Sequence, residues 1–163
     1  MKRISFLDTP GHEAFQGMRS RGARVADIAV LVVSAEDGVK AQTIEAHKSI
    51  KEAGIPYIVA INKIDKPNAN IDRTKQMLAE AEIYVEGYGG DVPWVAISAK
   101  TGQGVDDLLD TMLLVAEMAE LKGDQSKPAE GIIIESNMDP KKGVSATLII
   151  TDGTLKRVMF VVA

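Results

Sequence analysis

The chain has 163 residues, of which 45% are apolar and 26% charged, the composition of an ordinary globular protein. A formal charge of −4 excludes a broadly basic nucleic-acid binder, and the absence of cysteine excludes disulfides and thiolate metal sites and fits a reducing compartment. No apolar run reaches the roughly 18 residues of a membrane span, and the short N-terminal run is not a signal peptide.

Apolar runs alternate with helical patterns through most of the chain. The runs are residues 4–7 (ISFL), 28–33 (IAVLVV), 57–61 (YIVAI) and 94–97 (WVAI). They lack polar alternation, which is typical of strands buried on both faces of a parallel sheet. Spacings of three and four residues predict three helices. The first covers 42–53, the second follows Asn70 as its N-cap, and the third has Asp106 and Asp107 in its first turn. The order predicts a parallel α/β layer.

The pattern changes after residues 123–128, which we interpret as a linker. Apolar and polar residues alternate around 132–138 and 144–150, with a turn at 139–143, and Asp152 and Gly153 are expected to start another hairpin. We expect an antiparallel β-barrel that begins here, is not completed, and ends inside a strand at 159–163. The predicted domains are 1–122, the α/β domain, and 129–163, the start of the barrel.

The segment Asp8-Thr9-Pro10-Gly11-His12 follows the first apolar run directly. Ligands of open α/β sheets bind at the carboxyl ends of strands, where Asp8 could hold a magnesium ion. Gly11 would let the backbone approach a phosphate closely, and His12 could orient a water molecule. The alternative is an ordinary turn with an incidental histidine.

Asn62-Lys63-Ile64-Asp65 follows the run at 57–61 in the same way. Asp65 can accept two hydrogen bonds from the N1 and amino edge of guanine, Asn62 can pair with the opposite edge, and the stem of Lys63 can cover the ring. The alternative is a polar loop with a lysine–aspartate pair.

A third motif, Ser98-Ala99-Lys100, follows the run at 94–97. Its backbone amides could bind the guanine carbonyl. The motif is weak alone, and its value lies in its position, because all three motifs end successive strands at one edge of the predicted sheet.

The DTPGH, NKID and SAK elements together resemble sequence motifs of the translational GTPases. Longer stretches, including DTPGHEAF at 8–15, AINKIDKPNAN at 60–70 and SAKTGQGVDDLL at 98–109, are similar to bacterial-type translation initiation factors. GIIIESNMD at 131–139 resembles the opening of their β-barrel second domain. The resemblance implies a partial G domain of the P-loop NTPase type, without its phosphate-loop strand, followed by an incomplete barrel.

The resemblance also implies a function and assigns roles to residues. The parent protein would bind and hydrolyse GTP with Mg²⁺ in the cytoplasm, place initiator tRNA and promote joining of ribosomal subunits, without contacting DNA or membrane. Asp8 would hold the magnesium shell, Gly11 would sense the terminal phosphate, and His12 would position the hydrolytic water. The guanine pocket would comprise six residues: Asn62, Lys63, Asp65, Ser98, Ala99 and Lys100.

The chain departs from the family pattern because no G-x-x-x-x-G-K-[ST] motif occurs in its 163 residues. We therefore expect this chain alone to bind GTP poorly or not at all, and not to hydrolyse it. Two alternatives stay open: a non-catalytic fragment or interaction module, and a different nucleotide-binding α/β protein. Without the phosphate-loop strand, residues 4–7 and 28–33 would flank a gap or pair directly. Val158 stands where the family often has glycine, which leaves the start of a third barrel strand open.

Four further features have competing interpretations. Arg19, Arg21 and Arg24 could touch ribosomal RNA or a protein, or form a solvated helix face. We expect His47 on the surface, because Lys48 and Lys51 are near it in the helix. Glu36 and Asp37 look like a paired carboxylate site, but we expect them to start a loop. The aromatic residues around the glycine-rich segment 86–91 are expected to pack at the sheet edge, with a partner contact as the alternative: Tyr84, Tyr88 and Trp94.

Overall fold

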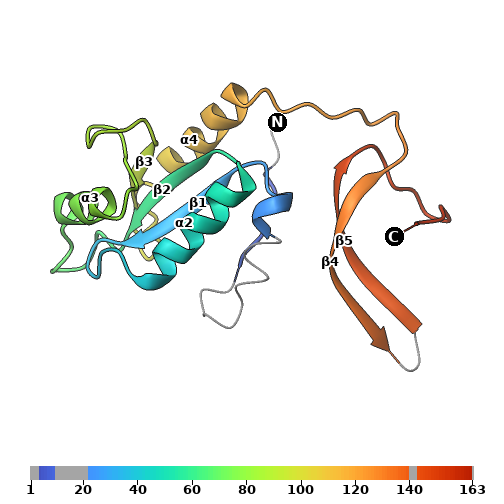
Figure 1. Ribbon diagram of the computed structural model, residues 1–163, viewed down its shortest axis with the longest axis horizontal. Coiled ribbons are helices and arrows are strands. Elements are labelled where there is room, and N and C mark those ends of the chain that lie inside the picture. Colours follow the sequence, from blue (N-terminus) through green and yellow to red (C-terminus); the bar gives the residue numbers. More distant parts are fainter. Residues whose placement is uncertain (1–3, 10–21, 140–142, 163) are drawn as a thin grey trace. The chain divides into compact units, whose positions relative to one another are not determined.

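A computed structural model of the chain describes residues 4–9, 22–139 and 143–162, which form two compact units, Met1–Glu120 and Leu121–Ala163 (Figure 1). The elements follow in the order β1 (Ala29–Ser34), α2 (Ala41–Ala53), β2 (Tyr57–Asn62), α3 (Ile71–Glu80), β3 (Trp94–Ala96), α4 (Val105–Met118), β4 (Glu130–Asp139) and β5 (Gly143–Asp152). The prediction of a parallel sheet with helices, followed by antiparallel β-structure, is confirmed. None of the described helices is long and apolar enough to cross a membrane.

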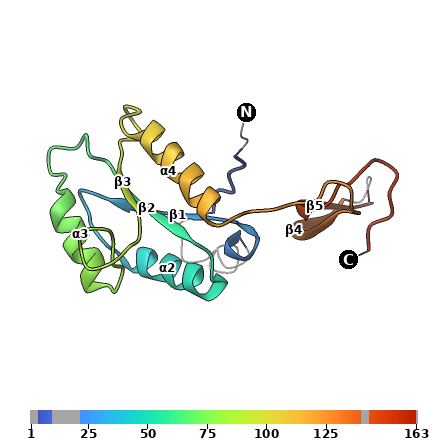
Figure 2. The ribbon, with the colours of Figure 1, turned by 90° about the horizontal axis from the view of Figure 1, so that it is seen from above.

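The first unit contains a parallel sheet in the order β1-β2-β3. Figure 2 shows α2 and α4 on opposite faces of this sheet. Because both faces are covered, Ile58, Val59, Ala60 and Ile61 of β2 are all completely buried. Burial on both sides explains why this run does not alternate with polar residues.

The main core lies on one face of the sheet. Alternate residues of β2, Val59 and Ile61, belong to the same cluster as Ile50 from α2 and Leu78 from α3. Because successive side chains of a strand point to opposite faces, Ile58 and Ala60 face the other side, where α4 lies. The sheet is therefore a rigid platform that fixes the loops at its carboxyl edge.

Local chemistry sets the helix ends. Asn70 caps α3 by accepting a hydrogen bond from the Arg73 backbone N–H at 2.9 Å, as predicted. Gly54 ends α2 in the left-handed conformation with φ of 68°. Asp106 and Asp107 lie in the first turn of α4, which is also as predicted.

Residues 4–7 are not a strand, and the prediction of one is wrong. They belong to no helix or strand, and Ile4 is 37%, Phe6 70% and Leu7 40% exposed. Over the described residues, the segment has no strand pairing with β1, so the direct pairing considered above does not occur. Apolar side chains alone do not make a strand, because its backbone groups also require a hydrogen-bonded neighbour.

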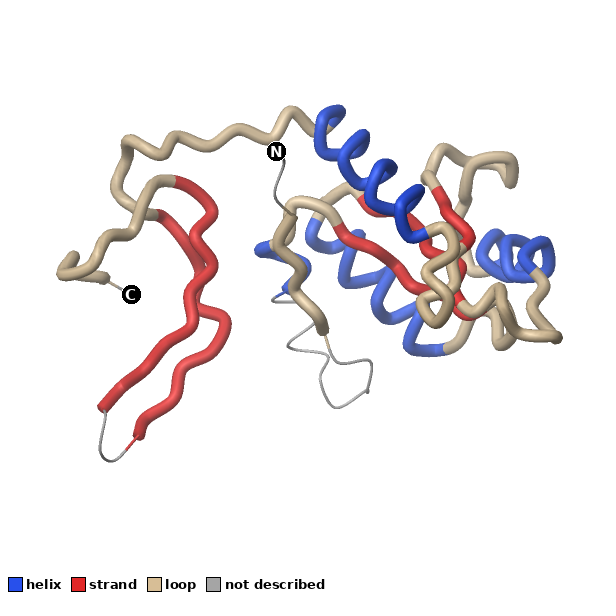
Figure 3. The backbone as a smooth tube through the Cα atoms, turned by 180° about the vertical axis from the view of Figure 1, so that it is seen from behind, coloured by secondary structure: helices blue, strands red, loops and turns tan. Residues whose placement is uncertain are grey.

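The second unit is built around the antiparallel pair β4 and β5, which Figure 3 shows as a long twisted ribbon. The joining residues 140–142 lie outside the described part of the chain. Asp152 at the end of β5 accepts hydrogen bonds from the backbone N–H groups of Asp124 at 2.6 Å and Gly153 at 2.9 Å. These bonds fasten the segment that precedes β4 to the end of β5.

The expected strand at 159–163 is not formed in its described part, residues 159–162. Val158 has a φ of 69°, in the left-handed region that β-branched residues rarely enter, and it turns the chain at this point. Phe160 and Val162 are fully or almost fully exposed. As at residues 4–7, an apolar sequence without a paired neighbour does not become a strand.

Candidate functional site

The carboxyl ends of β2 and β3 are joined by the side chain of Asn62. Its Oδ1 accepts a hydrogen bond from the Lys63 backbone N–H at 2.7 Å and another from the Ala99 backbone N–H at 3.0 Å. Ala99 is 37 residues further along the chain, so Asn62 holds the loop after β2 against the loop after β3. The two motifs that the sequence placed at one edge therefore form a single site.

Asp65 and Ser98 make a second link between these loops. The Ser98 hydroxyl, on a completely buried residue, donates to Asp65 Oδ1 at 2.7 Å and accepts from the Thr101 backbone N–H at 3.2 Å. The Ser98 hydrogen bond lowers the pKa of Asp65, and the positive charge of Lys100 acts in the same direction. Asp65 is exposed and ionised at neutral pH, so its carboxylate can accept hydrogen bonds from a ligand.

Lys63 has an unusual backbone conformation within this site. Its φ of 67° lies in the left-handed region, which non-glycine residues seldom occupy. Its ammonium group forms an ion pair with Asp37 at 3.1 Å, across the edge from the end of β1. The sequence indicated that Asp37 would begin a loop, which it does, but it did not indicate this contact.

The loop after β3 is itself well ordered by backbone contacts. The Ser98 N–H donates to the Gln103 carbonyl at 2.9 Å, and the Gly102 N–H donates to the Ser98 carbonyl at 2.8 Å. Gly104 is in the left-handed region with φ of 73°, and a Cβ there would lie 2.2 Å from the Ala96 carbonyl oxygen. Only glycine fits this close return of the chain, which sets the loop against the sheet.

The phosphate half of the predicted site is described only in part. Gly11 and His12 lie outside the described residues, as do Arg19 and Arg21. Asp8 is exposed in the segment after residues 4–7. No group of three or more histidine, cysteine, aspartate or glutamate residues that could hold a metal occurs in residues 4–9, 22–139 and 143–162. Asp8 is the residue of the magnesium prediction that lies within the described part of the chain.

His47 and the aromatic residues near the sheet edge lie in the described part of the chain. His47 is not on the surface: it is 5% exposed, and its Nε2 lies 3.0 Å from the Tyr57 hydroxyl. The expectation failed because His47 shares a helix face with buried Ile50, three residues on, and this face packs inward even though Lys51 is only four residues away. The expected packing at the sheet edge is confirmed for Tyr88 and Trp94, since both pack against the main core. Tyr84 is 47% exposed and does not belong to this cluster.

Comparison with known proteins agrees with this geometry. The family described as Elongation factor Tu GTP binding domain matches residues 1–118, so the chain belongs to this family of GTP-binding domains. The chain is 57% identical over 155 residues to translation initiation factor IF-2 of Finegoldia magna, and 56% identical to that of a Roseiflexus species. These alignments cover 95% of the chain but only 20% and 21% of the relatives, so the chain spans about a fifth of their length.

Solved structures show the same fold. The GDP-bound crystal structure of aIF5B from Aeropyrum pernix aligns over 91% of this chain and 30% of its own, with 30% identity and a TM-score of 0.65. Elongation factor SelB from Methanococcus maripaludis, in complex with the GTP analogue GppNHp, aligns over 90% of this chain and 32% of its own, with 29% identity and a TM-score of 0.69. The prediction of a translational GTPase fold is confirmed.

Proposed function

We propose that the chain is part of a translation initiation GTPase and supplies the guanine-recognition half of its nucleotide site. The observation that carries this proposal is the cross-linking of the loops after β2 and β3 by Asn62–Ala99 and Asp65–Ser98 contacts. These contacts fix an ionised carboxylate at the strand ends, where nucleotides bind in open α/β sheets. Translation initiation factor IF-2 is the name of the relatives described above.

Each pocket residue has a definite proposed role. Asp65 accepts hydrogen bonds from the N1 and exocyclic amino groups of guanine, and adenine cannot donate in this pattern. The stem of Lys63 covers one face of the ring, while the backbone amide of Lys100 faces the guanine carbonyl beside that of Ala99, which donates to Asn62 Oδ1 in this structure. Asn62 and Ser98 hold these groups in place through the hydrogen bonds given above. Recognition of the base therefore follows from a preorganised edge.

The proposal also assigns the contacts to phosphate and magnesium. Asp8 would hold magnesium, Gly11 would lie at the terminal phosphate, and His12 would position water for hydrolysis. Magnesium, when bound, would neutralise phosphate charge. Among the described residues, Asp8 is the candidate ligand of the ion. In the cytoplasm, the ribosome and initiator tRNA would be partners of the whole protein.

Base selectivity tests the proposal directly. Guanosine and adenosine are titrated to millimolar concentration into the 15N-labelled chain, and backbone amide shifts at Ala99 and Lys100 are followed. Guanosine is expected to shift these amides and adenosine to leave them unchanged. In Asp65→Asn, guanosine binding should weaken by on the order of tenfold and xanthosine should be preferred, because xanthine has an acceptor where guanine has its amino donor. Equal responses to guanosine and adenosine in the unsubstituted chain would refute the guanine site.

A further inference from the structure

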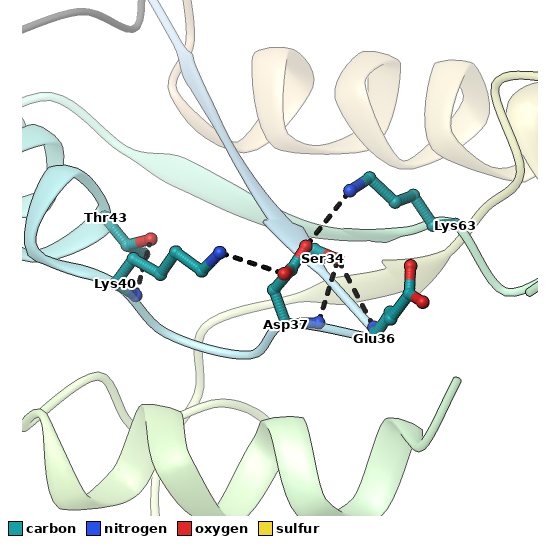
Figure 4. Close-up of polar contacts among 6 residues, drawn as sticks. All are labelled: Ser34, Glu36, Asp37, Lys40, Thr43 and Lys63. Carbon is teal, nitrogen blue, oxygen red and sulfur yellow. Dashed lines mark hydrogen bonds and ion pairs between the residues drawn. The ribbon is translucent and has the colours of Figure 1, made fainter. Parts of the chain in front are cut away.

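Asp37 lies between two lysines at the carboxyl edge of the sheet (Figure 4). Its Oδ1 is 2.9 Å from Lys40 Nζ, and its Oδ2 is 3.1 Å from Lys63 Nζ. The turn that carries it is fixed by Ser34, whose hydroxyl accepts hydrogen bonds from the backbone N–H groups of Glu36 at 3.3 Å and Asp37 at 3.1 Å. The carboxylate is thus held at the end of β1 by local structure.

Lys63 is anchored at both ends. At the backbone, its N–H donates to Asn62 Oδ1 at 2.7 Å, in the left-handed conformation noted above. At the tip, its ammonium group pairs with Asp37, a residue 26 positions earlier in the chain. Two elements therefore fix one lysine: β2 supplies its backbone, and the turn after β1 supplies its counter-ion.

We propose that Asp37 is a positioning residue for recognition of the guanine base and that it acts through Lys63. This inference rests on the proposed guanine site, in which the Lys63 stem covers the ring. A lysine side chain has many rotamers, and ordering it when a ligand binds reduces affinity. An ion pair that orders the chain beforehand removes part of that cost.

The electrostatics of the turn support this role. Hydrogen bonds from Lys40, which contributes most, and from Lys63 and Ser34, together with the charge of Lys40, hold the pKa of Asp37 well below its usual range. The carboxylate therefore stays charged at neutral pH. The side chains of Lys63 and Asp37 are 46% and 35% exposed, so the pair is a partly screened surface contact and its effect on affinity is modest.

The test uses the whole 163-residue chain and the guanosine titration described above. Asp37→Asn is expected to weaken guanosine binding by about three- to fivefold. Glu52→Gln is the control, because Glu52 forms an exposed ion pair with a different lysine, Lys48, at 3.9 Å. The control is expected to leave guanosine binding unchanged.

A double-mutant comparison separates positioning from a purely structural role. In a Lys63→Met background, Asp37→Asn is expected to cause no further loss of guanosine affinity, because the residue through which it acts no longer carries a charge. A structural effect on the turn would persist in that background and would overturn the inference. Unchanged guanosine binding in Asp37→Asn itself would also overturn it.

A nucleotide-free measurement keeps the inference testable if Asp37→Asn fails to fold. The 15N signal of the Lys63 ammonium group is expected to show slowed proton exchange in the unsubstituted chain, and a fully solvated ammonium there would refute the positioning contact. Asp65→Asn distinguishes failure of the positioning role of Asp37 from failure of the guanine site itself. Guanine preference that depends on Asp65 but not on Asp37 would refute this inference and leave the proposed function standing.

Discussion

Strands β2 and β4 are both rich in isoleucine, yet they have opposite environments. In β2, Ile58 and Ile61 are completely buried, because helices cover both faces of the sheet. In β4, Ile132 is 41% and Ile133 36% exposed. Apolar composition therefore predicts where a strand can be buried. The elements packed against the strand decide whether it is in fact buried.

Removal of a core side chain from the buried region should have the greatest effect of the changes proposed here. Leu78 of α3 is completely buried in the main core, so Leu78→Ala should lower the free energy of unfolding of the first unit by about 2–5 kcal/mol. Chemical denaturation followed by fluorescence of Trp94, the single tryptophan, measures it. Ile44→Ala is the control, since Ile44 is 52% exposed, and it should cost less than about 1 kcal/mol.

The equivalent substitution in the second unit should have a much smaller effect. Ile133→Ala removes a side chain that is already 36% exposed, so protection of the β4–β5 amides from hydrogen exchange should change little. A loss of stability in Ile133→Ala as large as that in Leu78→Ala would show that the β4–β5 pair is buried in solution, and would contradict the contrast between β2 and β4.

The second prediction concerns Ser98. Like the central residues of β2, Ser98 is completely buried, but its hydroxyl donates to Asp65 of the proposed guanine site. Ser98→Ala leaves the Thr101 N–H without its partner and removes the hydrogen bond to Asp65, so the first unit should lose about 1–3 kcal/mol. The pKa of Asp65 should rise towards its usual value, because this hydrogen bond is the main cause of its lowering. Carboxyl 13C shifts followed against pH measure the pKa.

The pH dependence of Ser98→Ala has a definite sign. The lowered pKa of folded Asp65 stabilises the fold above the unfolded carboxyl pKa of about 3.9, and this contribution disappears as pH falls towards the folded value. Ser98→Ala should therefore weaken that acid dependence. Ser49→Ala is a matched control, because the buried Ser49 hydroxyl donates to the Glu45 carbonyl of its own helix at 3.2 Å rather than to Asp65. An Asp65 pKa unmoved by Ser98→Ala would contradict the assignment.

The third prediction uses His47, whose burial lowers its pKa, with the charge of Lys51 as a lesser cause. An unfolded histidine binds a proton at higher pH than this folded one, so the first unit should lose stability as pH falls below about 6.5. His47→Gln should remove this slope and cost about 0.5–1.5 kcal/mol at neutral pH through the lost contact with Tyr57. Thermal unfolding at several pH values measures both. A slope that survives in His47→Gln would assign it to another group.

Some contacts of the proposed site can be predicted from the sequence, and others cannot. The meeting of Asn62, Asp65 and Ser98 is predictable, because successive parallel strands bring their carboxyl ends to one edge. The Lys63–Asp37 pair is not, since it depends on a left-handed backbone and on a turn 26 residues away. The segment at 4–7 was mispredicted for a related reason: its composition suits a strand, but pairing depends on a neighbour that the segment's own residues do not specify.

A smaller change in stability is expected at Val158, an exposed residue of the second unit. Its φ of 69° strains a β-branched side chain, and glycine adopts that conformation freely. Val158→Gly should therefore stabilise the turn in which the Met159 N–H donates to the Lys156 carbonyl at 3.4 Å, by less than about 1 kcal/mol. The Met159 amide should exchange up to about fivefold more slowly. Val161→Gly is the control, because Val161 does not have a positive φ, and it should give no such gain. Faster exchange at Met159 in Val158→Gly would mean that the entropy lost by glycine outweighs the relieved strain, and that in this uncovered region chain freedom, rather than local geometry, sets stability.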